Sequence, residues 1–331
     1  MFFINVVLGS LLSVSCLVPH ISAPHFPYFP LLSLMVPMLV LFNFLFFGYW
    51  LVQGKRYLWL PAVVLVLGYF FLGTFFKLGL SEKPIKREDV SVMSFNTRGF
   101  NKIELIKDKT IGQQIIDLVR SEDPDIVCFQ EFDRQRHKGK DFDAYKYSYV
   151  NLEPGKVVQA IYSKFPIVNE GTLDFPDSAN NAIFADIVIE RDTVRVYNLH
   201  LESHKVIPNI RRISRDKVKL LKRMSKSFAK QQEQVALFTA HKNTASYKKI
   251  VCGDLNNTQF SNVYRVMKGD MQDTFQEKGF GYGRSYDFKF LPFRIDFILM
   301  DDSFEVTAHR NFDVRYSDHY PVMASFRLKP H

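Results

Sequence analysis

Ile250-Val251-Cys252-Gly253-Asp254-Leu255-Asn256 is a short apolar run that ends in polar side chains. Apolar residues bounded by a glycine predict a buried strand, with Asp254 and Asn256 at its carboxyl end. Enzymes with α/β folds tend to hold reactive groups at that end of a strand. A Gly-Asp pair followed by two asparagines is also typical of a plain turn, so the stretch alone leaves both interpretations open.

Several other predicted strands carry a polar side chain at one end. These strands cover residues 90–96, 125–131, 194–200, 294–300 and 322–328, and the side chains beside them are Asn96, Glu131, His200, Asp296 and the pair Asp318-His319. Each has an ordinary structural explanation as a turn asparagine, a solvated carboxylate or a core histidine. Their repetition beside one strand after another favours a shared site.

The ordered motifs resemble a known family. They are SFNTRG, CFQEF, YSKFPI, NLHLES, GDLNN, RIDFIL and SDHYPV, and they run from about residue 90 to the end of the chain. In this order they resemble the endonuclease/exonuclease/phosphatase superfamily, which includes pancreatic deoxyribonuclease, abasic-site endonucleases, neutral sphingomyelinases and inositol polyphosphate 5-phosphatases. The resemblance implies a deoxyribonuclease I-like, four-layer α/β sandwich with two packed β-sheets. It also implies metal-dependent hydrolysis of a phosphate ester. The apolar spans of the first 80 residues lie outside the resemblance, and together with it they indicate a membrane-anchored member of bacterial type.

The resemblance implies a metal site. Glu131 is expected to be the main metal carboxylate with help from Asn96, and Asp318 to complete the shell of metal or water ligands. Carboxylate and amide oxygens are hard ligands that suit Mg²⁺, with Mn²⁺ as the alternative, and no thiolate cluster suggests a softer metal.

The resemblance also implies the roles of the catalytic side chains. Asp254 would orient or deprotonate the attacking water, and Asn256 would hold a phosphate oxygen. Asp296 would orient His319, which stabilises developing charge or carries a proton. His200 would contact the phosphate or act as the general acid. We place substrate contacts in the family motifs and in the glycine- and aromatic-rich loop of residues 280–292, at Arg98, Tyr162, Arg284 and Tyr286.

The first 80 residues differ from the rest of the chain. Apolar spans at about residues 2–18, 31–52 and 58–76 predict a membrane region with about three transmembrane helices. A cleaved signal peptide or lipid attachment at Cys16 is the alternative for the first span, but no Lys or Arg precedes its apolar run. We expect the membrane region at residues 1–80, a linker at 81–89 and the catalytic domain at 90–331.

The orientation follows from the loops. Lys55 and Arg56 lie between the second and third spans, whereas the first connection has no Lys or Arg. The positive-inside rule then predicts an extracytoplasmic catalytic domain in a bacterial cytoplasmic membrane. The basic residues that follow the third span argue the other way, namely Lys77, Lys83, Lys86 and Arg87.

The net charge of +9 comes from one segment. From Lys205 to Lys249 the chain has thirteen Lys or Arg residues against Asp216 and Glu233. Residues 210–240 have helical spacing, so the charge could be a solvated helical face or a surface that meets lipid headgroups or a phosphate-bearing substrate. The segment lacks the interleaved aromatic residues that would stack on nucleic-acid bases. Cys128 and Cys252 lie in apolar strands and are expected to be free thiols, although a bridge between them stays open.

The function that combines these features is a membrane-tethered, metal-dependent phosphodiesterase that acts on a lipid headgroup or a similar phosphate ester. A Mg²⁺-dependent nuclease is the alternative, with the basic segment tracking a phosphate backbone. A non-catalytic binding module on the same fold is disfavoured, since it has no chemical need for the whole set of acidic and histidine residues.

Overall fold

The computed structural model describes residues 1–23, 25–78, 83–133, 139–204, 217–288 and 291–329. Residues 205–216 of the predicted basic segment and part of the predicted linker lie outside this range. All three cysteines lie inside it, and each is a free, buried thiol.

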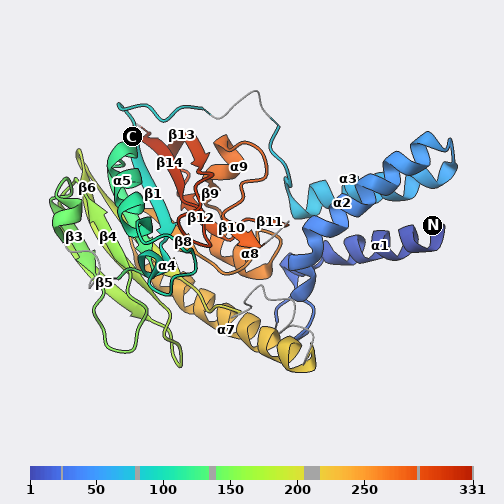
Figure 1. Ribbon diagram of the computed structural model, residues 1–331, viewed down its shortest axis with the longest axis horizontal. Coiled ribbons are helices and arrows are strands. Elements are labelled where there is room, and N and C mark those ends of the chain that lie inside the picture. The colour runs from blue at the N-terminus through green and yellow to red at the C-terminus, as the bar shows by residue number, and fades with distance from the viewer. Residues whose placement is uncertain (24, 79–82, 134–138, 205–216, 289–290, 330–331) are drawn as a thin grey trace.

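Two six-stranded sheets form the centre of the molecule (Figure 1). The first has the order β13-β14-β1-β2-β4-β3, with bounds β1 Val90–Asn96, β2 Ile126–Gln130, β3 Tyr147–Val150, β4 Ala160–Ser163, β13 Phe304–Asn311 and β14 Val322–Leu328. The second has the order β5-β6-β7-β8-β12-β9, with bounds β5 Ile167–Asp174, β6 Asn181–Ile189, β7 Asp192–His200, β8 Lys248–Asp254, β9 Gln272–Asp273 and β12 Asp296–Met300. A separate hairpin joins β10 Tyr286–Phe288 to β11 Leu291–Phe293.

Three apolar layers hold the sandwich together. The inner layer lies between the sheets and contains Cys128 from β2 and Cys252 from β8. A second layer packs the first sheet against α5, Ile111–Glu122, whose buried residues recur at helical spacing. A third packs the second sheet against α7, Lys217–Thr244, and α8, Asn262–Lys268. Helix, sheet, sheet and helix therefore form the four layers that the family motifs predicted.

The remaining short elements connect these layers. They are α4 Arg98–Asn101, η3 Gly139–Phe142 and α9 Thr274–Lys278. The strand predicted at residues 157–162 is shorter and shifted, as β4, and the helix predicted at 210–240 is observed in the described residues as α7.

The N-terminal helices form a bundle beside the sandwich (Figure 1). It consists of α1 Phe2–Ser15, η1 Val18–His20, α2 Leu31–Val52, η2 Arg56–Leu58 and α3 Trp59–Leu72. Residues Phe2–His20 and Leu31–Val52 are long and apolar enough to cross a membrane, whereas the apolar helix from Arg56 to Leu72 is shorter. The expectation of about three spans is therefore met only for the first two helices. The third is shorter, because Gly73, with φ +81°, leaves the helical conformation.

The bundle buries two asparagines among apolar residues and exposes many large apolar side chains. Asn5 and Asn43 are fully buried, while Phe3, Phe44 and Phe70 are each more than 60% exposed. The Trp50 indole N–H donates to Asn5 Oδ1 at 3.0 Å, and the Asn43 amide donates to Leu8 O at 3.3 Å. Such buried polar contacts between apolar helices are typical of packing in lipid.

One end of the bundle is attached to the sandwich. The Asn262 amide donates to Pro19 O at 2.8 Å, and the Ala23 N–H donates to Gln232 Oε1 of α7 at 2.7 Å. Phe260 is buried among apolar residues of α1, α2 and α3. The loop that follows β8 therefore carries the attachment to the bundle.

Gly253 allows β7 and β8 to pair closely. Its φ is +147°, and a Cβ atom there would lie 2.1 Å from the carbonyl oxygen of Leu199. The parallel register of these two strands sets Leu199 beside Gly253 and His200 beside Asp254. Any side chain larger than hydrogen at position 253 would push the two strand ends apart.

Candidate active site

The strand-end residues predicted from the sequence meet at one end of the two sheets. In the second sheet Asp254 pairs with His200 on one side and with Asp296 on the other. In the first sheet Asn96 pairs with Gln130, the residue before Glu131. His319 precedes β14, the neighbour of β1. Each sheet thus supplies part of a common cluster.

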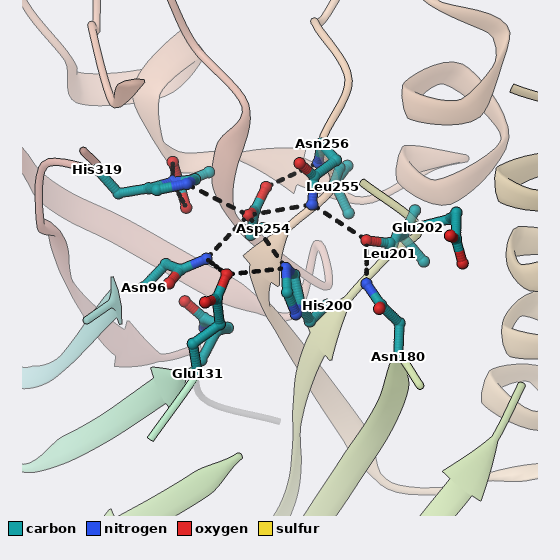
Figure 2. Close-up of polar contacts among 12 residues, drawn as sticks. Asn96, Glu131, Asn180, His200, Leu201, Glu202, Asp254, Leu255, Asn256 and His319 are labelled. Atoms are coloured by element: carbon teal, nitrogen blue, oxygen red, sulfur yellow. Dashed lines mark hydrogen bonds and ion pairs between the residues drawn. The ribbon is translucent and has the colours of Figure 1, made fainter. Parts of the chain in front are cut away.

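Asp254 is the centre of this cluster (Figure 2). Its Oδ2 accepts a hydrogen bond from the Asn96 amide at 3.1 Å, across the two sheets. The Nε2 atoms of His200 and His319 lie 3.5 and 3.6 Å from the same oxygen. The buried carboxylate is therefore surrounded by nitrogen groups, and its charge is not left uncompensated.

His319 and Asp296 form a buried pair. His319 Nδ1 lies 3.0 Å from Asp296 Oδ2, which leaves Nε2 directed towards Asp254. The buried Ser285 hydroxyl accepts the backbone N–H groups of Ile295 and Asp296 at 3.0 and 2.9 Å, and so fixes the start of β12. The imidazole is thus held with one nitrogen on a carboxylate and the other facing the cluster.

The surroundings shift the pKa values of these groups in opposite directions. Burial alone would raise the pKa of Asp254, but the imidazoles of His319 and His200 lower it to about 2. Burial raises the pKa of Asp296 to about 6. Burial opposes the protonation of His319, yet Asp296 and Asp254 raise its pKa to about 10. Opposite charges compensate one another in the cluster.

Glu131 lies on the more open side of the cluster and points towards Asn96 and His200 (Figure 2). Its Oε1 is 3.3 Å from the Asn96 amide nitrogen and 3.7 Å from His200 Nε2. Arg98 Nη1 lies between two carboxylates, 3.8 Å from Glu131 and 3.4 Å from Asp318. The predicted metal ligands Glu131 and Asp318 are therefore on either side of a guanidinium.

Asn96 and Asn256 make different hydrogen bonds in the cluster. Asn96 directs its amide nitrogen to the carboxylates, because its Oδ1 accepts the backbone N–H of Arg98 at 3.1 Å. Asn256 donates its backbone N–H to Asp254 Oδ1 at 2.7 Å and its side-chain amide to Leu201 O at 3.0 Å. Asn256 and Glu131 both have positive φ, +48° and +49°, a conformation that is strained for non-glycine residues and clusters at functional sites.

The four predicted substrate contacts are distributed unevenly. Arg98 is in the cluster, and the Tyr286 ring lies 4.8 Å from the His319 ring. Arg284 instead pairs with Asp313 at 2.6 Å, at the periphery. Tyr162 is buried in the aromatic core, where it lies 4.8 Å from the Phe142 ring. The structure does not bring Tyr162 to the cluster, because it pairs with Val127 at the far end of β2 from Glu131.

The structure adds supporting residues that the sequence analysis missed. Gln130 donates to Asn198 Oδ1 at 2.6 Å, and Asn198 donates to Phe129 O at 2.8 Å, so the two sheets are joined directly beneath the cluster. From α7, buried Gln231 donates to Glu202 O at 2.7 Å and to Asn256 O at 3.2 Å, and thereby ties together the loops after β7 and β8. Gln130 and Asn198 lie in the family motifs and Gln231 lies outside them, and nothing in their spacing indicated a partner.

The donor set fits a divalent cation. One ligand atom from each of Asp254, Asp296 and His319 can be chosen so that all three lie within 4.8 Å of one another. Because the raised pKa of His319 keeps its imidazole protonated, the carboxylate oxygens are the donors of this group. Glu131 adds a half-buried carboxylate next to this group. Clustered carboxylate oxygens without a thiolate match the ligands that hard divalent cations take.

Two packed sheets with carboxylates and histidines at one end define a deoxyribonuclease I-like α/β sandwich. The chain belongs to the endonuclease/exonuclease/phosphatase family, whose model matches residues 93–319. Members of this family are metal-dependent phosphoesterases, so the chain is a phosphoric ester hydrolase. A second model, for a domain of unknown function, matches residues 1–75. No curated protein matches the chain.

Solved structures share the fold. Humanized TDP2 from D. rerio aligns with a TM-score of 0.57 at 15% identity, covering 72% of this chain and 99% of that chain. The catalytic domain of human Nocturnin with bound sulfate gives 0.56 at 15% identity, covering 74% and 96%. A mannosyl-6-phosphatase from Bacteroides thetaiotaomicron gives 0.53 at 19% identity, covering 72% and 100%.

Proposed function

We propose that the protein is a membrane-tethered phosphodiesterase that uses Mg²⁺ to hydrolyse the phosphate ester of a lipid headgroup or a similar membrane-borne substrate. The observation that carries this proposal is the convergence of His200, His319 and Asn96 on one oxygen of Asp254. Two imidazoles and a carboxylate within hydrogen-bonding reach of one point suit the binding of a phosphate and the transfer of its protons.

Each residue of the cluster takes a role in this proposal. Asp254 orients the attacking water, and Asn256 holds a phosphate oxygen beside it. His319, held by Asp296, stabilises the charge that develops on the phosphate oxygens. His200 contacts the phosphate and supplies a proton to the leaving oxygen. Arg98 and Tyr286 border the site and would contact the substrate.

Glu131 and Asp318 are the residues we assign to Mg²⁺, with Asn96 beside them and Mn²⁺ as a substitute ion. A bound divalent cation supplies Lewis-acid stabilisation of the developing phosphate charge. Arg98, which lies between these two carboxylates, would contact the negatively charged substrate beside the cation.

The N-terminal bundle is the proposed membrane anchor, within residues 1–80, ahead of a catalytic domain that begins near residue 90. Exposed apolar side chains around buried asparagines support this, because a water-soluble bundle has the opposite arrangement. Aromatic residues gather at the end remote from the sandwich, where Tyr57 contacts Phe2 and Trp50. Tyrosine and tryptophan favour the membrane interface.

We further propose that the catalytic domain is extracytoplasmic in a bacterial cytoplasmic membrane. Lys55 and Arg56 lie in the connection between α2 and α3, at the end of the bundle opposite the sandwich. The positive-inside rule assigns that end to the cytoplasm. A reporter fused after His331 that is active only in the cytoplasm would contradict this orientation.

The decisive experiment is a substrate panel. The purified full chain, with Mg²⁺ or with EDTA, is assayed on phospholipids, DNA and RNA. We expect Mg²⁺-dependent release of a lipid headgroup, lost by a factor on the order of 10² or more in Asp254→Asn. The matched control is Asp270→Asn, since Asp270 also follows a glycine but lies exposed in an ordinary turn. Activity on nucleic acid alone would establish the nuclease instead, and activity on no substrate would favour a binding module.

A further inference from the structure

The first two turns of α7 extend beyond the core on which the helix packs. We call residues 217–224 the α7 overhang. Within it Val218 is 63% and Leu221 is 42% exposed, whereas Phe228, one turn further on, is fully buried. Val218 and Leu221 therefore form an apolar stripe that no sheet covers in the part of the chain that the structure describes.

The opposite side of this part of the helix is basic. From Lys217 to Lys230 there are six Lys or Arg residues and no acidic residue. At 100° per residue, Lys219 and Lys226 lie across the helix from Leu221 and the buried Phe228. Lys222 lies at the side of the helix, about 100° from Leu221, and Lys217 lies at the edge of the apolar stripe. An amphipathic helix with an apolar stripe and a lysine-rich face is typical of helices that lie in a membrane interface.

The α7 overhang lies at the end of the bundle that is attached to the sandwich. In Figure 1, the N-terminal end of α7 lies near the connection between α1 and α2, and the helix runs from there to beneath the sheets. Measured along the bundle, this end reaches the ends of α1 and α2 that are nearer to the sandwich. The hydrogen bond from Ala23 to Gln232 fixes this proximity. Phe26 and Tyr28 of the same connection are exposed, 58% and 52%, as aromatic residues at a membrane surface would be.

We propose that the α7 overhang inserts Val218 and Leu221 into the surface of the bilayer that holds the N-terminal bundle and binds anionic phospholipid through its lysines. The inference rests on the membrane anchoring that is part of the proposed function. Two features identify the occupant as lipid: the charge complementarity and the continuity with the ends of the proposed membrane helices.

Hydrogen bonds from α7 connect the helix to the loops of the active site, and Gln231 contacts two of these loops. Gln231 lies on α7 below the overhang and donates to the backbone of Glu202 and of Asn256, next to His200 and Asp254. A bilayer that holds the overhang therefore also holds the end of the sandwich where the cluster lies, close to the headgroups. The substrate class that fits is a phosphate ester of the same leaflet, presented from the membrane surface.

The test places an environment-sensitive nitrobenzoxadiazole dye on Leu221→Cys in the full chain, reconstituted in vesicles of phosphatidylcholine with or without phosphatidylglycerol. The native cysteines are buried and do not compete for the label. Leu237→Cys is the matched control, because Leu237 is on the same helix and equally exposed, at 42%. Doxyl-labelled lipids report the contact of each dye with the bilayer.

We expect the emission of the dye at 221 to be about twofold higher in vesicles with phosphatidylglycerol than in vesicles without it, and to be quenched there by doxyl lipid. The dye at 237 should show neither change. Lys222→Glu with Lys226→Glu should abolish the response at 221 while the chain still floats with the vesicles. Equal signals at 221 and 237 would overturn the proposal. A response to a DNA oligonucleotide but to no vesicle would also overturn it and mark a nucleic-acid surface.

The experiment separates this inference from the catalytic proposal. Dye emission and quenching need no substrate turnover, so they stand whether or not headgroup hydrolysis is observed. Failure of the chain to float with vesicles of either composition would overturn the anchoring and the inference together. Flotation without lipid contact at 221 would overturn the inference alone.

Discussion

His319 shows how a single residue acquires a function from its surroundings. Asp296 lies on its Nδ1 side, and Asp254 lies opposite its Nε2. Burial alone lowers the pKa of an imidazole, as it does at His309, whereas the two carboxylates reverse that direction at His319. The same side chain is thus neutral in one buried environment and cationic in another.

The first prediction concerns this pair. His319→Ala should lower turnover by a factor on the order of 10² or more, because it removes the group that faces the phosphate. Asp296→Asn should also lower turnover while leaving substrate KM nearly unchanged, since it misorients the imidazole and removes a carboxylate that raises the pKa of His319. Steady-state kinetics on the substrate that the panel identifies will measure both. Unchanged hydrolysis by His319→Ala would refute the assignment.

The second prediction concerns His309, which lies away from the cluster. Burial lowers its pKa to about 4. A histidine with a depressed pKa in the folded state stabilises the protein fully above its unfolded pKa, near 6.5, and that stability is lost as the pH falls towards 4. His309 alone should lower the free energy of unfolding by about 1.4 kcal/mol per pH unit in this window.

Urea unfolding of the full chain in detergent, at several pH values, measures this decline. His309→Gln removes one titrating group and should reduce the slope between pH 6.5 and 4 by about 1.4 kcal/mol per pH unit. His204, whose pKa burial also lowers to about 4, keeps its own contribution. Its Thr274 partner, 2.8 Å from Nδ1, remains available to the glutamine amide. Parallel profiles for the two proteins would show that His309 does not carry the effect.

At the scale of elements, the pairing of β7 with β8 decides where the cluster forms. Both strands end on a side chain of the cluster, and their parallel register puts His200 and Asp254 side by side. The close approach at Gly253 sets that register. A strand end can be recognised in a sequence, but the lateral fit of two strands depends on atoms from both.

The third prediction follows from Gly253. Gly253→Ala should destabilise the protein by roughly 3 kcal/mol or more and abolish most activity, because the added Cβ would overlap the Leu199 carbonyl. Gly269→Ala is the control, since Gly269 also has positive φ but a Cβ there meets no atom closer than 3.9 Å. Denaturant unfolding should give about 1 kcal/mol for the control. Equal losses would mean that backbone conformation alone, and not contact with β7, explains the glycine.

At the scale of the whole molecule, the bundle and the sandwich share a buried contact. Phe260 follows the Asp254 loop and packs into the bundle with Val36 and Leu72. Nearby, Gln259 donates to Thr74 O at 3.3 Å and accepts from buried Arg294 at 2.7 Å. The proposed anchor is therefore packed against the loop that carries the central carboxylate.

The fourth prediction tests this contact. Phe260→Ala should cost about 3–5 kcal/mol of stability, the usual range for a buried phenylalanine, and should lower turnover because the Asp254 loop loses its support. Val266→Ala, at a 40% exposed site on α8, should change stability by less than about 0.5 kcal/mol. Thermal unfolding in detergent and kinetics on one preparation provide both readouts. Normal turnover in a strongly destabilised Phe260→Ala would show that this contact does not support the active site.

The sequence predicted the strand ends well because burial and strand period are local properties. Asn96, His200 and Asp254 each terminate an apolar run, and the family motifs supplied their order. The sequence did not show which face of a strand each side chain occupies. Tyr162 belongs to a family motif, but its ring points into the layer beneath α5 and not towards the cluster.

Supporting contacts could not be predicted because they join residues far apart in the chain. Gln130 and Asn198 are 68 positions apart, and each looks like an ordinary polar residue within an apolar strand. Ser285 supports the start of β12 from a loop whose composition suggested only substrate contact. Buried polar pairs of this kind follow from the packing of two sheets, which periodicity does not describe.

The hydrogen bond between Gln130 and Asn198 has a consequence for the timing of folding. Neither sheet holds the complete set of proposed catalytic groups, and the first sheet combines β1 to β4 with β13 and β14 from the far end of the chain. Before the sheets meet, a folding chain has only separate halves of a site. A partly folded molecule is therefore expected to be inactive, and the appearance of activity during refolding reports when the two sheets pack together.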